Sequence, residues 1–367
     1  MSIPLDCTAD WAKRDRVSAA RSRPHGPTNR PERASEKPPP FRDQRESRWE
    51  IDVRALRYDS FGPVGAVVRL TEVAQPRPGR GQVLVRVQYA AINPLDCKLV
   101  EGEFKRIFRS RPPAGIGTEF GGTVEALGPG VALPKIGTTV VGFIDPTARP
   151  PGALQQFVAV DAGDVLPVDA ADLDRACTLP VAGVAALQMC RLTGVKGGDR
   201  VLVHGAAGGV GSFAVQIVRI LGARAVATGS RLSQPVLESL GPEAVVNYAT
   251  QKVSAWGGPF TAVLDCASTL GDADIAELLP NGGRYVRTLP AFPSMLLDPL
   301  LNATRPVKRF TLRLKPNTDD VRTLLNWMRR GMLMPLVSEQ VALANAVAAL
   351  ERLQTGRTHG KLVVRVA

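Results

Sequence analysis

A run of glycines and alanines over residues 205–211 has the composition of a phosphate-binding turn. A pyrophosphate approaches the backbone at the start of a helix, where free N–H groups and the helix dipole favour negative charge. Gly208 and Gly211 match the last two glycines of the G-x-G-x-x-G fingerprint, whereas Ala206 stands where its first glycine is expected. The pattern indicates dinucleotide binding. The alternative is a glycine turn that only closes a helix onto a sheet.

The flanking residues predict the elements that position this turn. Residues 201–203 form a short β-branched run typical of a buried strand, and residues 224–228 begin a second strand. Between them, apolar residues recur at helical spacing from Phe213, and Gly222 ends the helix. The sequence therefore predicts one βαβ unit. The residues of its turn expected to bind the dinucleotide are Ala207, Gly208, Gly209, Val210 and Gly211.

Length and composition exclude several classes of protein. The chain has 367 residues, which suggests two domains, and no apolar run approaches the ~20 residues of a membrane helix. The formal net charge of +12 is dispersed and aromatic residues make up 5 %, so we expect neither nucleic acid nor membrane as a partner. The five cysteines are irregularly spaced, which favours reduced thiols and a cytoplasmic location.

Composition also divides the chain along its length. Residues 1–52 are rich in Arg, Pro, Ser and Glu and are expected to be a disordered extension; a second hypothesis is that the natural protein starts at Val53. Residues 53–177 hold short strands with frequent Gly and Pro, as in a partly open β-barrel. Residues 178–315 alternate helix and strand, as in a doubly wound parallel sheet. Residues 316–367 predict two helices and a closing strand that returns to the first domain, giving an α/β protein.

Five motifs stand in a familiar order: AAINPLDCK, GTEFGGTVEALGPGV, LPVAGVAAL, VLVHGAAGGVG and HGKLVV. Together they resemble the medium-chain dehydrogenase/reductase superfamily, and within it the zinc-independent quinone oxidoreductase and enone oxidoreductase branch. The resemblance spans about residues 53–367. It implies a GroES-like barrel domain over 53–177 and 316–367, a Rossmann domain over 178–315, and a homodimer.

The resemblance also implies a site without metal. Zinc-dependent relatives place a cysteine at the position of Asn93, a histidine at that of Thr118, and a further cysteine near residues 179–183, where this sequence has none. Catalytic zinc needs about three N, S or O ligands from the protein. Without a Lewis acid to polarise an alcohol or simple ketone, the interpretation as an alcohol dehydrogenase is weakened.

The chemistry that remains is hydride transfer to a carbon made electron-poor by conjugation. Lys98 matches a lysine that contacts the substrate oxygen in enone oxidoreductases, and its ammonium could stabilise an enolate; the alternative is a solvated helix lysine. Asn93 matches a residue that bonds the nicotinamide ribose or positions substrate. Asp96 could orient Asn93 or Lys98, or cap the helix that follows. These three residues are the catalytic candidates.

The cofactor follows from charge. An NAD site usually has an acid at the end of the second strand of the βαβ unit, and here residues 228–231 hold none. Ser230 and Arg231 can instead donate to a 2′-phosphate, and relatives use a tyrosine at the position of Tyr248 near that phosphate. Lys361 matches the family's closing Gly-Lys, which lies near the cofactor. We therefore expect NADPH.

The sequence thus predicts an NADPH-dependent, zinc-independent reductase of quinones or α,β-unsaturated carbonyls. Two alternatives stay open. One is an enoyl-thioester reductase of lipid or polyketide type. The other is an NADPH-binding protein with little turnover.

Overall fold

The structure of this protein, a computed structural model, describes residues 52–106, 108, 111–147, 152–289 and 294–367. Apart from Asp52, the extension predicted at 1–52 lies outside the described residues. The strands of the described part form three sheets.

A seven-stranded sheet is built around β3 (Gln82–Ile92). β5 (Glu119–Leu127) pairs with one edge of β3, while β7 (Phe157–Asp161) and β16 (Lys361–Arg365) share the other edge. The sheet also contains β6 (Thr139–Phe143), β8 (Val165–Pro167) and β15 (Val337–Ala342). All its pairs are antiparallel except β15 with β16.

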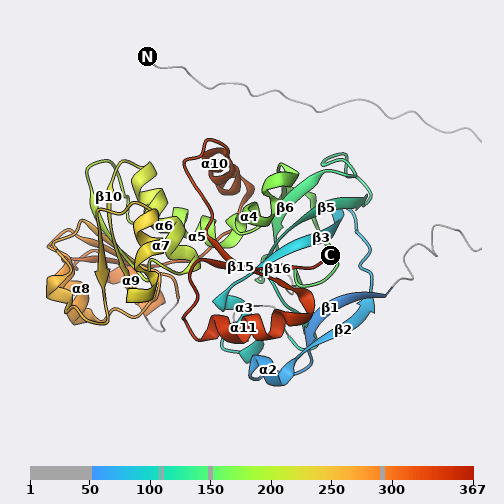
Figure 1. The fold of residues 1–367 in the computed structure, drawn as a ribbon, viewed down its shortest axis with the longest axis horizontal. Coiled ribbons are helices and arrows are strands. Elements are labelled where there is room, and N and C mark those ends of the chain that lie inside the picture. The colour runs from blue at the N-terminus through green and yellow to red at the C-terminus, as the bar shows by residue number, and fades with distance from the viewer. Residues whose placement is uncertain (1–51, 107, 109–110, 148–151, 290–293) are drawn as a thin grey trace, which may run out of the picture. The chain divides into compact units, whose positions relative to one another are not determined.

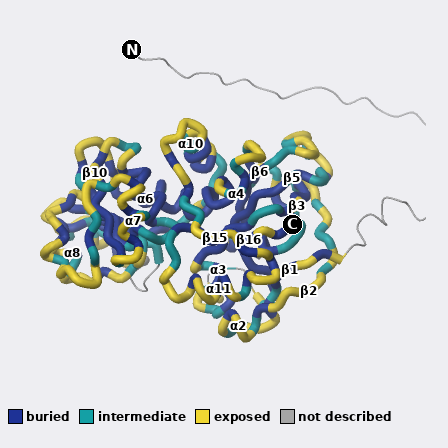
Figure 2. Tube along the Cα trace, viewed as in Figure 1, coloured by how far each residue is buried: buried dark blue, intermediate teal, exposed yellow. Residues whose placement is uncertain are grey.

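A three-stranded sheet lies beside it in the order β2-β1-β4. Its strands are β1 (Asp52–Tyr58), β2 (Val68–Ala74) and β4 (Ala114–Gly115). Most of β2 is exposed, whereas Leu56 on β1 is buried and donates its N–H to the carbonyl of Leu154 at 2.9 Å (Figure 2). The two sheets share one apolar core, as expected for a partly open barrel.

The middle of the chain forms a six-stranded sheet in which every neighbouring pair is parallel. Its strands are β9 (Arg200–His204), β10 (Arg224–Gly229), β11 (Ala244–Asn247), β12 (Ala262–Asp265), β13 (Arg284–Arg287) and β14 (Lys308–Thr311). The order β11-β10-β9-β12-β13-β14 reverses direction between β9 and β12. The predicted doubly wound sheet is confirmed, and ligands bind outside the carboxyl ends of strands at such a switch point.

Helices cover these sheets (Figure 1). The α-helices are α2 (Val64–Val67), α3 (Pro94–Glu101), α4 (Leu173–Ala176), α5 (Val184–Leu192), α6 (Gly209–Ile220), α7 (Gln234–Ser239), α8 (Asp272–Leu278), α9 (Ser294–Leu301), α10 (Thr318–Arg329) and α11 (Ala346–Gln354). Short 3-10 turns are η1 (Ala162–Asp164), η2 (Ala170–Asp172), η4 (Arg231–Ser233), η5 (Val253–Ala255) and η6 (Leu343–Asn345), and η3 (Leu179–Gly183) is a π-helical turn before α5. Within the described ranges, none of these helices has the length and apolarity to cross a membrane.

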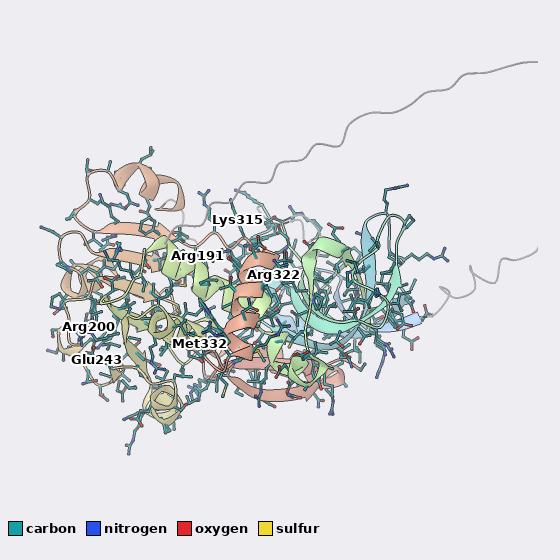
Figure 3. The ribbon with its side chains drawn as sticks, turned by 90° about the horizontal axis from the view of Figure 1, so that it is seen from above. Arg191, Arg200, Glu243, Lys315, Arg322 and Met332 are labelled. Carbon is teal, nitrogen blue, oxygen red and sulfur yellow. The ribbon has the colours of Figure 1, made fainter. Side chains whose placement is uncertain are left out.

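Charged side chains tie the surface elements of the parallel sheet to one another. Asp320 on α10 is buried and accepts hydrogen bonds from Arg191 and Gln188 of α5 (Figure 3). Arg200, the first residue of β9, forms a 2.8 Å ion pair with Glu243 just before β11 (Figure 3). The Arg200–Glu243 pair lies at the amino end of the sheet and is therefore not part of the edge formed by the carboxyl ends of the strands.

The end of the chain returns to the first sheet, as the sequence predicted. β16 pairs antiparallel with β3, so that Leu362 lies opposite Ile92. α11 packs on α3, and the Cys97 thiol donates to the carbonyl of Leu350 at 3.6 Å. In Figure 1 the red elements β15, β16 and α11 accordingly lie among the blue and cyan ones.

Candidate functional site

The glycine turn follows the carboxyl end of β9, at the switch point of the parallel sheet. Gly205 has a left-handed φ of +71°, and a Cβ on it would lie 2.9 Å from the Cβ of Ala267. A Cβ on Gly211 would lie 2.6 Å from the Cα of Ala206. The tight-turn glycine is therefore Gly205, and not the position of Ala206 as the fingerprint predicted. The chain turns one residue earlier than in G-x-G-x-x-G, because β9 ends at His204.

α6 begins directly after this turn, with Gly208 at its N-cap. The first N–H groups of a helix have no partner inside it, and those of Gly209, Val210 and Gly211 make no recorded hydrogen bond within the described chain. A Cβ on Gly208 would meet only the carbonyl oxygen of Gly205, 3.5 Å away. Free donors, an open space and the helix dipole together fit a pyrophosphate.

The start of β16 is joined to the glycine turn. The N–H of Gly360 donates to the carbonyl of Ala207 at 2.7 Å, and Gly360 forms an isolated bridge with Gly208. The side chain of Lys361 passes over the first residue of α6, since a Cβ on Gly209 would lie 2.7 Å from its Cδ. The start of β16, a strand of the barrel sheet, thus also contacts the glycine turn.

Lys361 is buried, and three oxygens bind its ammonium group. The ammonium donates to the carbonyl of Ile92 at 3.0 Å, to Oδ1 of Asn93, and to Oε1 of Glu119 at 2.8 Å. Glu119 also accepts from Nδ2 of Asn93 at 3.0 Å and from the N–H of Val181 at 2.8 Å. A buried ion pair is stable only when its remaining donors and acceptors are bonded, and here they are. We call Lys361, Asn93 and Glu119 the buried triad.

Asn93 and Lys361 were predicted as site residues from the sequence, whereas Glu119 was not. A signal for it exists, because Glu119 begins an apolar strand and a charged residue at such a position must find a partner. Desolvation raises the pKa of Glu119, while the Lys361 ammonium and the bonded donors lower it. Both carboxylate oxygens of Glu119 accept hydrogen bonds, as expected for an ionised group. The positive charge of the Lys361 ammonium neutralises the negative charge of this carboxylate.

Asp96 lies in the first turn of α3 and is buried. Its Oδ2 accepts the N–H of Asn93 at 2.7 Å, and its Oδ1 accepts the hydroxyl of Thr118 at 3.3 Å. This is a capping box, so Asp96 orients the backbone of Asn93 and not the side chain of Lys98. Burial raises the pKa of Asp96 to about 7, against the hydrogen bond from Asn93 and the charge of Lys361.

The structure places Lys98 apart from the buried triad. Both carboxylate oxygens of Glu103 accept from its ammonium, at 2.8 and 2.7 Å, and the Lys98 side chain is 26 % exposed. Glu103 thus takes two of the three N–H groups of the Lys98 ammonium, which leaves one for a substrate oxygen. Its catalytic role stays a prediction.

The residues predicted to bind a 2′-phosphate lie at neighbouring strand ends. Ser230 and Arg231 follow β10, and Tyr248 follows β11, whose last residue Asn247 pairs with Gly229. Arg231 is exposed, and no partner for its guanidinium is recorded among the residues that the structure describes. The carboxyl end of β10 thus offers hydroxyl and guanidinium donors and no carboxylate.

Buried polar groups support the same edge of the sheet. His204 lies between the hydroxyls of Thr228 and Thr269, 2.8 Å from each, and burial lowers its pKa. Asp265, which ends β12, accepts the N–H groups of residues 268–270. His204 is therefore a packed, neutral residue, held by the hydroxyls of Thr228 and Thr269.

The polar groups of the buried triad and its neighbours suit an ammonium group and do not suit a zinc ion. Across the described ranges, no three His, Cys, Asp or Glu side chains gather into a metal-binding group. Val181 presents an N–H, which cannot ligate a cation, and the Lys361 ammonium already holds the oxygens of Asn93 and Glu119. Thr118 bonds Asp96 instead of the triad.

Two family models match the chain. An alcohol dehydrogenase GroES-like domain matches residues 79–170, and a zinc-binding dehydrogenase domain matches residues 240–364. The chain belongs to the medium-chain dehydrogenase/reductase superfamily. Members of this superfamily of oxidoreductases use NAD(H) or NADP(H).

Relatives in the superfamily match most of the chain. It is 26 % identical over 324 residues to the chloroplast envelope quinone oxidoreductase homolog of Arabidopsis thaliana, covering 85 % of this chain and 98 % of that protein. It is 28 % identical over 323 residues to 2-methylene-furan-3-one reductase of Solanum lycopersicum, covering 85 % and 79 %. The solved quinone oxidoreductase from Coxiella burnetii superposes with a TM-score of 0.78 at 29 % identity, covering 86 % of this chain and 100 % of that one.

Two glycines of the turn are expected to respond differently to alanine. Gly208→Ala should fold normally yet lose at least about tenfold in dinucleotide affinity, because the methyl group fills the open space. Gly211→Ala should instead lose about 1–3 kcal/mol of stability, because the methyl group meets backbone. Thermal unfolding and cofactor fluorescence measure the two effects. Full cofactor affinity in Gly208→Ala would contradict the assignment.

Asp96→Asn should change the pH dependence of stability. The folded carboxyl keeps its proton up to about pH 7, whereas the pKa of an unperturbed Asp is 3.8. Wild-type protein should therefore lose about 2 kcal/mol relative to the variant as pH rises from about 5 to 7. Urea unfolding at both pH values measures the difference, with exposed Asp59→Asn as the control. Parallel profiles for wild type and Asp96→Asn would refute the raised pKa.

Proposed function

We propose that this protein is an NADPH-dependent, metal-independent reductase of quinones or α,β-unsaturated carbonyl compounds. The buried triad carries the proposal, because an ammonium group holds the oxygens that a catalytic cation would need. A site without a Lewis acid is poorly suited to polarise an alcohol or a simple ketone. A conjugated substrate needs less help, since its β-carbon is already electron-poor. The relatives named as a quinone oxidoreductase and a furanone reductase support the same substrate class.

The proposed roles follow from the positions of the residues. When bound, NADPH supplies a hydride from its nicotinamide ring. Residues 207–211 bind the pyrophosphate, and Ser230, Arg231 and Tyr248 bind the 2′-phosphate. As the hydride reaches the β-carbon, negative charge develops on the carbonyl oxygen, and a donor on α3 or at its N-cap stabilises it. Lys98 and Asn93 are the candidates for that donor, and a side chain or water then protonates the α-carbon.

Two further properties complete the proposal. We infer from the resemblance to the quinone oxidoreductase branch that the protein is a homodimer, and from the irregular spacing of its cysteines that it acts in the cytoplasm. Analytical ultracentrifugation at micromolar concentration tests the first inference, and a sedimenting species of monomer mass would contradict it.

A direct assay separates the proposed function from its alternatives. Oxidation of NADPH is followed by absorbance with a quinone, a short enone and an enoyl thioester, each with and without a metal chelator. We expect turnover of the quinone or the enone, unchanged by the chelator. Preference for the thioester would support an enoyl-thioester reductase, and NADPH binding without turnover would support a binding protein. Loss of activity on chelation would contradict metal independence.

Arg231→Ala should weaken NADPH binding and leave NADH binding unchanged. A hydrogen bond from arginine to phosphate contributes roughly 1.5–3 kcal/mol, which is about ten- to a hundredfold in affinity. Titration of each cofactor by fluorescence measures the effect. Arg224→Ala, at the opposite end of β10, is the matched control. Equal losses for the two cofactors in Arg231→Ala would refute its contact with the 2′-phosphate.

Lys98→Met should lower kcat with little change in NADPH affinity. Removal of one donor to a developing oxyanion costs about 10²–10³ in kcat. Steady-state kinetics with an enone measure the effect, and exposed Lys135→Met is the control. An unchanged kcat would leave Lys98 as a surface residue paired with Glu103.

A further inference from the structure

The buried triad fixes the orientation of one amide. An ammonium group can only donate, so the Asn93 atom that meets Lys361 must be the carbonyl oxygen. An ionised carboxylate can only accept, so the Asn93 atom that meets Glu119 must be the NH₂ group. With partners of opposite character at its two ends, the Asn93 amide has one orientation and not two.

This orientation leaves Asn93 with one available donor. One N–H of its amide goes to Glu119, and no acceptor for the second is recorded in the described part of the chain. Asn93 follows the end of β3. The Lys361 side chain, which bonds the Asn93 amide, passes over Gly209 of the glycine turn. Any ligand at this place therefore meets Asn93 as a hydrogen-bond donor, and must present an oxygen acceptor.

We propose that Lys361 and Glu119 are positioning residues, a tethered cation and its counter-charge that hold the Asn93 amide so that one N–H is free for an oxygen of the bound cofactor or substrate. The proposal rests on the proposed function, which supplies those oxygens: a ribose hydroxyl of NADPH or the carbonyl of the substrate. The backbone and the side chain of Lys361 are both held in place, so its ammonium group stays beside Asn93. Its strand pairs with β3, and its side chain lies against α6.

Lys361→Ala removes three carbons and the ammonium, a group that n-propylammonium can replace. Measured with NADPH and an enone, kcat or NADPH affinity of the variant should fall at least about tenfold. Either should recover in n-propylammonium chloride and not in tetramethylammonium chloride, which carries the charge without an N–H donor. Wild-type protein in both salts is the control. A loss in NADPH affinity assigns the Asn93 donor to the cofactor, and a loss in kcat alone assigns it to the substrate.

A double variant keeps the proposal testable if Lys361→Ala does not fold. Glu119→Gln combined with Lys361→Met removes both charges together, which costs a buried site less stability than removing one. The double variant should unfold like wild type and still show the reduced kcat or NADPH affinity, because nothing then fixes the Asn93 amide. Glu125→Gln, on the same strand β5 in an ion pair with Arg86, should change neither.

The outcomes separate the two proposals. Wild-type protein that reduces neither quinone nor enone would refute the proposed function, and NADPH affinity alone would then decide the role of Lys361. Wild-type kcat and wild-type NADPH affinity in folded Lys361→Ala or in the double variant would overturn the positioning role. So would a reduced variant that n-propylammonium fails to restore, or that tetramethylammonium restores equally.

Discussion

The ion pair between Lys361 and Glu119 is the interaction on which the site depends. Both groups are buried, and two charges withdrawn from water are stable only with each other and with a full set of hydrogen bonds. The partners lie 242 residues apart in sequence, so the pair forms only when the last strand has returned to the first sheet. Because the N–H of Gly360 donates to the carbonyl of Ala207, the residue next to Lys361 also joins the barrel sheet to the glycine turn.

This ion pair links residues from separate parts of the chain that we propose to bind the cofactor and the substrate. Asn93 receives its side-chain orientation from the ion pair and its backbone position from Asp96. The glycine turn receives a backbone hydrogen bond from Gly360, next to Lys361. Hydride transfer requires two carbons held close together in a fixed orientation. A buried cluster whose two charged groups are fully hydrogen-bonded, at the junction of the two sheets, is a rigid way to provide that alignment.

Much of the fold could be predicted from the sequence, and each miss has a physical reason. β9 and β10 lie at the predicted positions because each is a short run of mostly apolar residues next to a turn. β14 and β15 were missed because charged and polar side chains interrupt them. α6 begins four residues before Phe213, since the glycines that suit a phosphate carry no apolar signal. Glu119 was missed because its partner, Lys361, is near only in the folded chain.

A metal-independent reductase of the kind proposed transfers hydride to the β-carbon of a conjugated substrate and not to its carbonyl carbon. NMR of the product formed from an enone and NADPH deuterated at both C4 positions of the nicotinamide ring shows where the hydride goes. We predict a saturated ketone with deuterium on the β-carbon. An allylic alcohol with deuterium on the former carbonyl carbon would contradict the proposed function.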